Sequence, residues 1–434
     1  MDPGSFPPTT ADTTRTPPGW AGRLRSVLGP GFITGASDDD PSGIGTYASI
    51  GAAQGFGVLW LAPLTLPLMA AVQLICARIG LVTGEGIAGV LRRTFPRWVR
   101  YPAIATLVVA NTINAGVDIG AIAAGVNLLV PIPATALIVP IGLLILALQI
   151  LGSYRLIARV FKWLTLALFT YLGAAILAQP DWGAVLRGTL LPSVRLDGDF
   201  LMALVAVLGT TISPYLFFWQ ASEEVEEEIS AGRASVAERA GATESELRAA
   251  AWDVGTGMAF SNLVMYVIIL ASAATLYRSG QRDITSAAEA AQALAPLAGN
   301  AASALFAIGI IGAGMLAVPV LTGSAAYAVA EGGGWRSGLD ARPRDAKVFY
   351  AVIIISTLVG MVIDFSPVDT ITALYWTAVL NGLLAPPLLM LVLLIANNRA
   401  VMGEHTNTRT LNLLGWTTVL AMSAAALGLL WSWR

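Results

Sequence analysis

Four aspartates lie in stretches of the chain that are otherwise apolar. Asp38, Asp39 and Asp40 are consecutive, and Asp118 stands in a second stretch. Neither stretch contains a Lys or Arg that would pair with them. A charged carboxylate at the centre of a membrane costs about 2.5–3.5 kcal/mol or more, so such a residue usually faces a pathway or a partner. Without a basic partner, we expect a proton or a cation to neutralise these groups.

Two prolines interrupt apolar stretches near their middle. The first follows Asp40 in the pair Asp40-Pro41, and the second follows Ser213 in the pair Ser213-Pro214. Proline has no N–H and clashes with the preceding turn, so carbonyls upstream of it lose their helical partners. The Asp40 carboxylate, these carbonyls and the hydroxyls of Thr210 or Ser213 would form a set of oxygen atoms only. Such a set suits Mg²⁺, Mn²⁺ or Ca²⁺.

The two carboxylates before the first break allow more than one role. Asp38 and Asp39 directly precede Asp40 in the chain. A position at the entrance of a pathway, or a role in capping a helix end, competes on equal terms with direct ligation of a cation. The sequence leaves these alternatives open.

The overall composition places these residues in a membrane. Of 434 residues, 56% are hydrophobic and 12% charged, and the mean hydropathy is +0.71, whereas soluble domains carry roughly 25% charged residues. A net charge of −2 gives no signal for nucleic-acid binding. Cys76 and His405 are the only residues of their types, which excludes internal disulfides, iron–sulfur clusters and the usual zinc sites. We expect no resident cofactor.

The motifs of membrane-embedded enzymes are also missing. The chain has no His-Glu-x-x-His sequence, and Asp118 follows Gly-Val where an aspartyl intramembrane protease has Gly-x-Gly. His405 lies between apolar windows, in a loop, where it cannot serve a buried nucleophile. The sequence therefore predicts that the protein is not an enzyme.

Eleven apolar windows are long enough to cross a bilayer, which takes about 20 residues. They lie at 28–54, 57–80, 102–130, 133–152, 161–179, 200–220, 254–276, 302–330, 347–366, 371–397 and 411–432. The segment 1–22 is rich in Pro and Thr and lacks a signal-peptide pattern, so it predicts a disordered cytoplasmic tail. The segment 23–434 predicts a single all-α, polytopic transmembrane domain.

The basic residues predict the orientation of the chain. With the N-terminus in the cytoplasm, 20 of the 25 Lys and Arg residues fall on the cytoplasmic side. The positive-inside rule favours this arrangement over its reverse. We expect a multi-pass protein of the cell's inner (plasma) membrane, surrounded by lipid bilayer, and the oligomeric state stays open.

The two breaks occupy corresponding places in two blocks of five spans. The first block covers 28–179 and the second 200–397, and an extra helix covers 411–432. Because five is odd, the second block enters the membrane from the opposite side, and the two blocks form an inverted repeat. Paired broken helices in inverted halves are typical of secondary transporters with a substrate site near the bilayer midplane.

The residues around both breaks resemble those of a known family. The run GPGFITGA at 29–36, followed by DPSG at 40–43, resembles the first helix of the Nramp family of proton-coupled divalent metal transporters, whose motif there is Asp-Pro-Gly-Asn. The run LGTTISPY at 208–215 is similar to that family's sixth helix, which ends in Met-Pro-His. The similarity runs through all eleven spans. It implies a LeuT-type fold and a divalent metal cation as the transported substrate.

The resemblance also implies a set of metal ligands, in which this chain departs from the family. Asp40 matches the ligating aspartate, but Gly43 replaces the asparagine and Ser213 replaces the methionine. At the glutamine of span 10 the alignment gives Thr377 or Ala378, with Asn381 one turn on. The implied metal site is Asp40, Gly43, Thr210, Ser213, Thr377 and Asn381. The loss of a soft sulfur makes Mg²⁺ admissible, keeps Mn²⁺ and disfavours Cd²⁺, a logic that resembles the Nramp-related magnesium transporters.

The departures from the family also change the expectation for proton coupling. Tyr215 replaces the family's histidine, and Ala121 replaces a glutamate three residues after Asp118. Asp118 is then either half of a proton route or a hydrogen-bonded core carboxylate. We expect import of Mn²⁺, Mg²⁺ or both by alternating access with weak or absent proton coupling. The membrane potential supplies about 4.6 kcal/mol per 100 mV for two charges.

A second transport hypothesis concerns organic substrates. LeuT-type folds also carry small molecules such as amino acids, and Asp40 would then bind the amine. The run Asp38 to Asp40 would repel the substrate carboxylate, which favours the metal cation.

Overall fold

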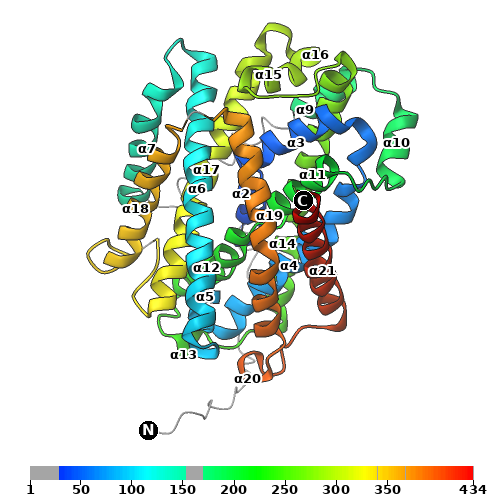
Figure 1. The fold of residues 1–434 in the computed structure, drawn as a ribbon. Helices are drawn as coiled ribbons and strands as arrows, with labels where there is room; N and C mark the ends of the chain where they lie inside the picture. The colour runs from blue at the N-terminus through cyan, green and yellow to red at the C-terminus, as the bar shows by residue number, and fades with distance from the viewer. Residues whose placement is uncertain (1–28, 153–169, 340, 367, 434) are drawn as a thin grey trace.

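The protein is a bundle of helices in which the long helices run between two ends that carry the short ones (Figure 1). The computed structural model describes residues 29–152, 170–339, 341–366 and 368–433. All regular elements in these ranges are helical. The short helices α15 and α16 lie at one end of the bundle, and α13 and α20 lie at the other (Figure 1).

The first block of spans contains the helices that precede residue 198. They are α2 Pro30–Asp38, α3 Pro41–Gln54, α4 Leu61–Thr83, α5 Ile87–Thr94, α6 Arg97–Leu129, α7 Ala134–Leu151, α9 Thr170–Leu177 and α10 Trp182–Leu190. Most of the predicted fifth span and the predicted tail 1–22 lie outside the described residues.

The second block repeats the pattern of a divided helix followed by long ones. Its helices are α11 Gly198–Thr211, α12 Pro214–Ser230, α13 Val236–Arg239, α14 Glu244–Ser272, α15 Ala287–Ala291, α16 Ala295–Ala298, α17 Ala302–Gly333, α18 Lys347–Ile363 and α19 Thr370–Ala396. The chain ends with α20 Arg399–Met402 and α21 Arg409–Ser432.

Eight helices in the described residues are long and apolar enough to cross a membrane. They correspond to predicted spans 2, 3, 4, 6, 7, 8, 10 and 11. Span 1 is present as the two half-helices α2 and α3, span 9 is the 17-residue helix α18, and span 5 is described only from Thr170. Several helices extend beyond the apolar windows. Helix α14, for example, begins at Glu244 because Thr243 and Glu246 form a reciprocal capping box there.

Both predicted breaks are present, and they have the same backbone form. Asp39 ends α2 with ψ of 52°, and Asp40 is extended before Pro41 opens α3. Likewise, Ile212 ends α11 with ψ of 57°, and Ser213 is extended before Pro214 opens α12. In each case the proline takes the first helical position, where its missing N–H costs nothing. Its fixed geometry therefore starts the second half-helix and prevents the first from continuing.

Glycines allow both broken helices to approach their neighbours closely. A Cβ built on Gly35 of α2 would lie 2.2 Å from the carbonyl oxygen of Gly257 in α14. A Cβ on Gly209 of α11 would lie 2.1 Å from the carbonyl oxygen of Ala378 in α19. These positions accept no side chain without movement of the backbone. The two broken helices are thus held against α14 and α19 by backbone contact.

Candidate functional site

Asp40 lies at the centre of the first break and is 1% exposed. Its Oδ1 accepts hydrogen bonds from the backbone N–H of Gly43 at 2.7 Å and from the Ser42 hydroxyl at 2.8 Å. Its Oδ2 accepts one from Asn114 Nδ2 of α6 at 3.0 Å. Asp40 is therefore the N-cap of α3, and the positive end of that half-helix stabilises its charge.

Gly43 faces a point that three oxygen atoms share. A Cβ built on Gly43 would lie 3.1 Å from Thr210 Oγ1, 3.4 Å from the Asp38 carbonyl oxygen and 3.4 Å from Asp40 Oδ1. These atoms come from α2, the break itself and α11. Gly43 thus lies where oxygens of both broken helices converge, and any side chain at this position would contact them.

The predicted ligands of the second break differ in how their hydroxyls are used. Thr210 Oγ1 is buried, and its polar neighbour is the hydroxyl of Tyr47 in α3 and not a carbonyl of its own helix. Ser213 Oγ donates to the carbonyl oxygens of Gly209 at 2.8 Å and Thr210 at 2.9 Å. Its lone pairs stay available, but its hydrogen is engaged by its own helix.

Tyr215 connects the two broken helices. Its hydroxyl donates to the carbonyl oxygen of Ser37 at 3.0 Å. Ser37 is the next-to-last residue of α2, and its carbonyl has lost its helical partner because the helix ends at Asp38. Tyr215 thus satisfies an acceptor that the break exposes, and this hydrogen bond is a structural role that the sequence does not reveal.

Asp118 lies in α6 beside the first break, next to Asp40 and Ser42. It is fully buried, and the backbone N–H of Ser42 is a polar neighbour of its carboxylate. Asp364, just after α18, is its neighbour and packs against Gly120. Sequence analysis did not single out Asp364. Its signal was available, because it is an acidic residue inside the predicted apolar window 347–366.

Asp38 and Asp39 are fully buried, so neither lies at a surface entrance. Both carboxylates converge on the hydroxyl of Ser261 in α14, at 2.6 Å from Asp38 Oδ2 and 3.3 Å from Asp39 Oδ1. The N-cap of α3 is Asp40, and Asp39 occupies the C-cap position of α2.

The predicted ligands of span 10 lie in α19 at the level of the breaks. Leu374 packs against Gly45 of α3, and the carbonyl of Ala378 packs against Gly209. Thr377 lies between them, is buried, and donates to the Leu374 carbonyl of its own helix at 2.7 Å. Asn381 is also buried, one turn further along α19. The geometry brings neither side chain into a hydrogen bond with Asp40.

Asn114 is a second residue near the break, besides Asp364, that sequence reasoning missed. It donates to Asp40 through Nδ2, and its Oδ1 is buried without a partner. Asn114 precedes Asp118 by one helical turn, so the two share a face of α6. That spacing on an otherwise apolar helix was the available signal. Its free amide oxygen adds a further neutral ligand beside Asp40.

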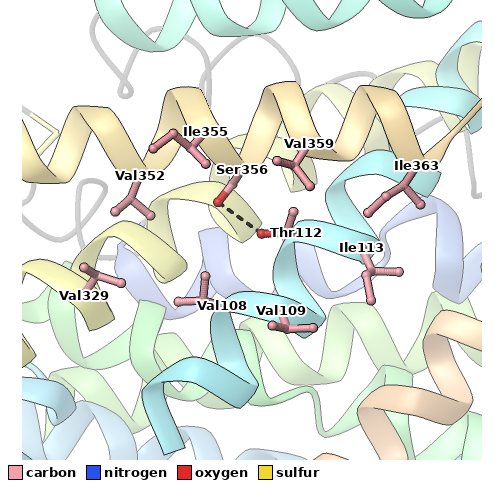
Figure 2. A pocket seen from close by; sticks show the side chains of 10 residues that line it. All are labelled: Val108, Val109, Thr112, Ile113, Val329, Val352, Ile355, Ser356, Val359 and Ile363. Atoms are coloured by element: carbon pink, nitrogen blue, oxygen red, sulfur yellow. Dashed lines mark hydrogen bonds between the residues drawn. The ribbon is translucent and has the colours of Figure 1, made fainter. Parts of the chain in front are cut away.

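Two cavities lie away from the breaks. An apolar groove of about 390 Å³ runs between α6, α17 and α18 (Figure 2), where the Thr112 hydroxyl donates to Ser356 Oγ at 3.1 Å. Aliphatic side chains line the rest of it, which is typical of a lipid-facing surface. A second cavity of about 790 Å³ lies at the end of the bundle where α3 ends and α11 and α19 begin.

The comparisons with known proteins agree on one family. A family model described as "Nramp: Natural resistance-associated macrophage protein-like" matches residues 31–432. The divalent metal cation transporter MntH of Yersinia pestis is 28% identical over 401 residues, which are 91% of this chain and 92% of that protein. The protein of the same name from Yersinia enterocolitica is 29% identical over 421 residues, with 94% and 95% covered.

Solved structures share the fold. The manganese transporter of Eremococcus coleocola superposes with a TM-score of 0.69 at 19% identity, covering 96% of this chain and 89% of that chain. Mhp1, a nucleobase-cation-symport-1 family transporter, superposes with a TM-score of 0.57 at 14% identity, covering 93% and 91%. The predicted all-α, LeuT-type architecture with two broken helices is thereby confirmed.

Proposed function

The chain belongs to the Nramp family, and on that premise we propose that it imports Mn²⁺, Mg²⁺ or both by alternating access. Asp40 supplies the negative charge of the substrate site. Thr210, Asn114 and the carbonyl of Asp38 supply neutral oxygens, and Gly43 leaves space for the ion. The remaining predicted ligands are Ser213, which precedes α12, and Thr377 and Asn381 of α19.

The observation that carries this proposal is the shared point in front of Gly43. Oxygens of both broken helices surround it at 3.1–3.4 Å, and carboxylate, hydroxyl and carbonyl oxygens are the ligands that hard divalent cations prefer. That point lies one carbon–carbon bond from the Gly43 Cα, so the ion would bind in front of it, among the same oxygens.

The cavity near the ends of α3, α11 and α19 supports a route to this site. Residues 49–54 of α3 line the cavity, and Asp40 lies at the opposite end of the same helix. Ile44 and Tyr47 lie between them and are both 0% exposed. The cavity is thus closed before it reaches the site. With the N-terminus in the cytoplasm, this cavity faces the outside of the cell. The proposed site at Asp40 is then closed on its outer side.

Weak or absent proton coupling is the finer part of the proposal. Tyr215, at the place of the family's histidine, uses its hydroxyl to hold the Ser37 carbonyl. A tyrosine has a reference pKa of about 10 and does not carry protons near neutral pH. Asp118 and Asp364 are the acids that a residual proton route would use.

Uptake into proteoliposomes tests the proposal. We expect Mn²⁺ and Mg²⁺ to enter under an inside-negative potential, and Cd²⁺ to compete poorly. Asp40→Asn should abolish uptake, whereas Asp369→Asn, at an exposed helix start with no side-chain hydrogen bond, should not. Full activity of the Asp40 variant would refute the site, and displacement of Mn²⁺ by amino acids would favour the organic-substrate hypothesis. A pH dye in the same vesicles should show no stoichiometric proton entry.

A further inference from the structure

The groove between α6, α17 and α18 is open at the surface of the bundle. Val109, Ile355 and Val359 line it and are 57%, 60% and 44% exposed, and Figure 2 shows side chains of α6 and α18 on its two sides. Its two hydroxyl groups, on Thr112 and Ser356, hydrogen-bond to each other at 3.1 Å. The wall of the groove therefore suits a hydrocarbon chain better than a polar ligand.

The length and the depth of the groove match one leaflet of a bilayer. Along α18 the lining runs from Val352 to Ile363, which is about 16 Å at 1.5 Å per residue. One leaflet contributes about 15 Å of hydrocarbon. Val352 and Val329 lie four or five residues from the ends of α18 and α17, or about 6–8 Å. The headgroup layer is about 5–8 Å thick, so the helix ends lie at its level.

Basic residues are concentrated at this end of the groove. The segments 92–101 and 335–347 together hold eight Lys and Arg residues against two acidic ones. The first segment leads into α6, and the second connects α17 with α18. The two segments thus adjoin the three helices that line the groove. With the N-terminus in the cytoplasm, as the sequence predicts, they lie on the cytoplasmic side.

The two basic segments also meet in the fold. A Cβ built on Gly332 of α17 would lie 2.3 Å from Ile104 Cδ1 of α6, and one on Gly334 would lie 2.5 Å from Arg92 Nη1. The Arg92 guanidinium therefore lies against the end of α17. Basic residues that only orient a chain in the membrane must be on one side of it, but need not converge from distant segments at one groove.

Several of these cations have no carboxylate partner. Arg93 forms an ion pair with Glu85, whereas Arg92, Arg97 and Arg336 form none with the residues that the structure describes. The first turn of α6 has no side-chain cap, so its N–H groups add to the positive potential. The end of the groove is therefore ready to receive a negative group.

Aromatic side chains mark the same level. Trp98 is 78% exposed, Trp335 is 54% exposed and Tyr101 is 50% exposed. Exposed Trp and Tyr are typical of the boundary between headgroups and hydrocarbon. Tyr101 precedes Val108 by seven residues, and Trp98 precedes Val109 by eleven. Both spacings are close to whole helical turns, so these aromatic rings lie on the face of α6 that lines the groove.

We propose that this face binds an anionic phospholipid of the cytoplasmic leaflet. One acyl chain occupies the groove, and Arg92, Arg97 and Arg336 hold the headgroup. A guanidinium group matches phosphate oxygens in charge and in geometry, and basic pockets between transmembrane helices are known places for acidic headgroups. A soluble phosphate would leave the apolar groove unused. The inference goes beyond the proposed transport function and does not depend on the transported ion.

Native mass spectrometry of the purified full-length protein tests the headgroup contacts. Phosphatidylglycerol and phosphatidylcholine with identical acyl chains serve as the probes. We expect one phosphatidylglycerol to be retained per chain in preference to phosphatidylcholine. Arg97→Gln combined with Arg336→Gln should weaken its binding about 25-fold, or about fivefold for each basic residue. Arg187→Gln is the matched control, because Arg187 is exposed at the end of α10, on the predicted outer side, and should change nothing.

Phosphatidylglycerol with a photoreactive group in its acyl chain tests the groove. Crosslinks in the native protein should fall on the lining residues of α6 and α18. Val359→Trp fills the groove without changing its charge and should abolish these crosslinks. Val362→Trp lies on the same helix, is 71% exposed in the native protein and does not line the groove, so it should keep them. A cooperative melting transition checks that each variant is folded.

Three outcomes would overturn the lipid site. Equal retention of the two lipids would mean that the basic residues do not select the headgroup. Native binding by the double arginine variant would mean that these residues only orient the chain in the membrane. Crosslinks spread evenly over the lipid-facing helices, or unchanged in Val359→Trp, would mean that the groove holds no particular chain. None of these results bears on the metal site at Asp40.

Discussion

A methyl group at Gly43 would enter the space that we assign to the transported ion. In Gly43→Ala the new carbon lies 3.1 Å from Thr210 Oγ1 and 3.4 Å from both Asp40 Oδ1 and the Asp38 carbonyl. None of these contacts is below 3.0 Å, so the backbone keeps its place. Alanine in a helix gains about 0.5–1 kcal/mol over glycine, which offsets the tight contact with Thr210. We expect the stability of the fold to stay within about 1 kcal/mol of the native value.

The effect on the ion is much larger than the effect on the fold. A carbon atom at the shared point keeps the ion or its water away from at least one of the three oxygens. Each charge-assisted contact is worth about 1.5–3 kcal/mol, and 1.4 kcal/mol corresponds to a tenfold change in affinity. Gly43→Ala should therefore weaken Mn²⁺ and Mg²⁺ binding about 10- to 100-fold.

Isothermal titration calorimetry on the purified protein measures this change, with thermal unfolding as the check on folding. Gly45→Ala is the matched control, because its Cβ would lie 3.1 Å from Leu374 Cδ1, an equally tight contact with an apolar side chain. The control should bind the ions as the native protein does. Native affinity in Gly43→Ala, or equal loss in both variants, would show that the oxygens in front of Gly43 do not hold the ion.

Three further predictions concern ion selectivity, the anchoring of α2 and the packing of α6 against α18. Ser213→Met places a thioether at the second break and should raise the competition of Cd²⁺ against Mn²⁺ uptake, because soft ions prefer sulfur; unchanged competition would show that position 213 does not contact the ion. Asp253→Ala removes the acceptor of three N–H groups at the start of α2, which should destabilise that helix end by about 0.5–2 kcal/mol. Thiol labelling of a buried Thr34→Cys probe should then become about tenfold faster. An unchanged rate would contradict a role for this cap in holding α2. Gly116→Ala drives a Cβ to 2.4 Å from the Gly360 carbonyl and should lower the stability by about 1–3 kcal/mol in thermal unfolding. Gly255→Ala, which meets nothing within 4 Å, should not, and equal melting of the two variants would argue against tight α6–α18 packing.

The positions of the breaks were predictable because their cause is local. Proline at 41 and 214 prevents helix continuation whatever surrounds it, and the structure places both prolines at the first turn of a new helix. The oxygen character that we propose for the site also follows from local sequence. Apolar windows that carry Asp, Ser and Thr but neither basic nor sulfur side chains at the breaks leave only oxygen ligands.

The ends of the helices were less predictable than their cores. Helix α12 continues to Ser230, ten residues beyond the predicted window, through a segment with five glutamates between positions 223 and 228. Hydropathy marks the part of a helix that lies in the bilayer, but capping groups and tertiary contacts decide where it ends. The same reason explains why α14 begins at Glu244.

The sequence by itself determined the class of the protein, the two breaks and the types of polar side chain at them, because composition, proline and charge act over a few residues. Only the tertiary structure decided which carboxylate does what. In the folded protein Asp40 accepts hydrogen bonds from Asn114 and from the backbone of Gly43, whereas Asp38 and Asp39 lie against the hydroxyl of Ser261. Adjacent residues at a helix break point in different directions, and their partners come from helices that are more than 70 residues away in the chain. No local sequence pattern predicts these contacts, because they arise from how the helices pack.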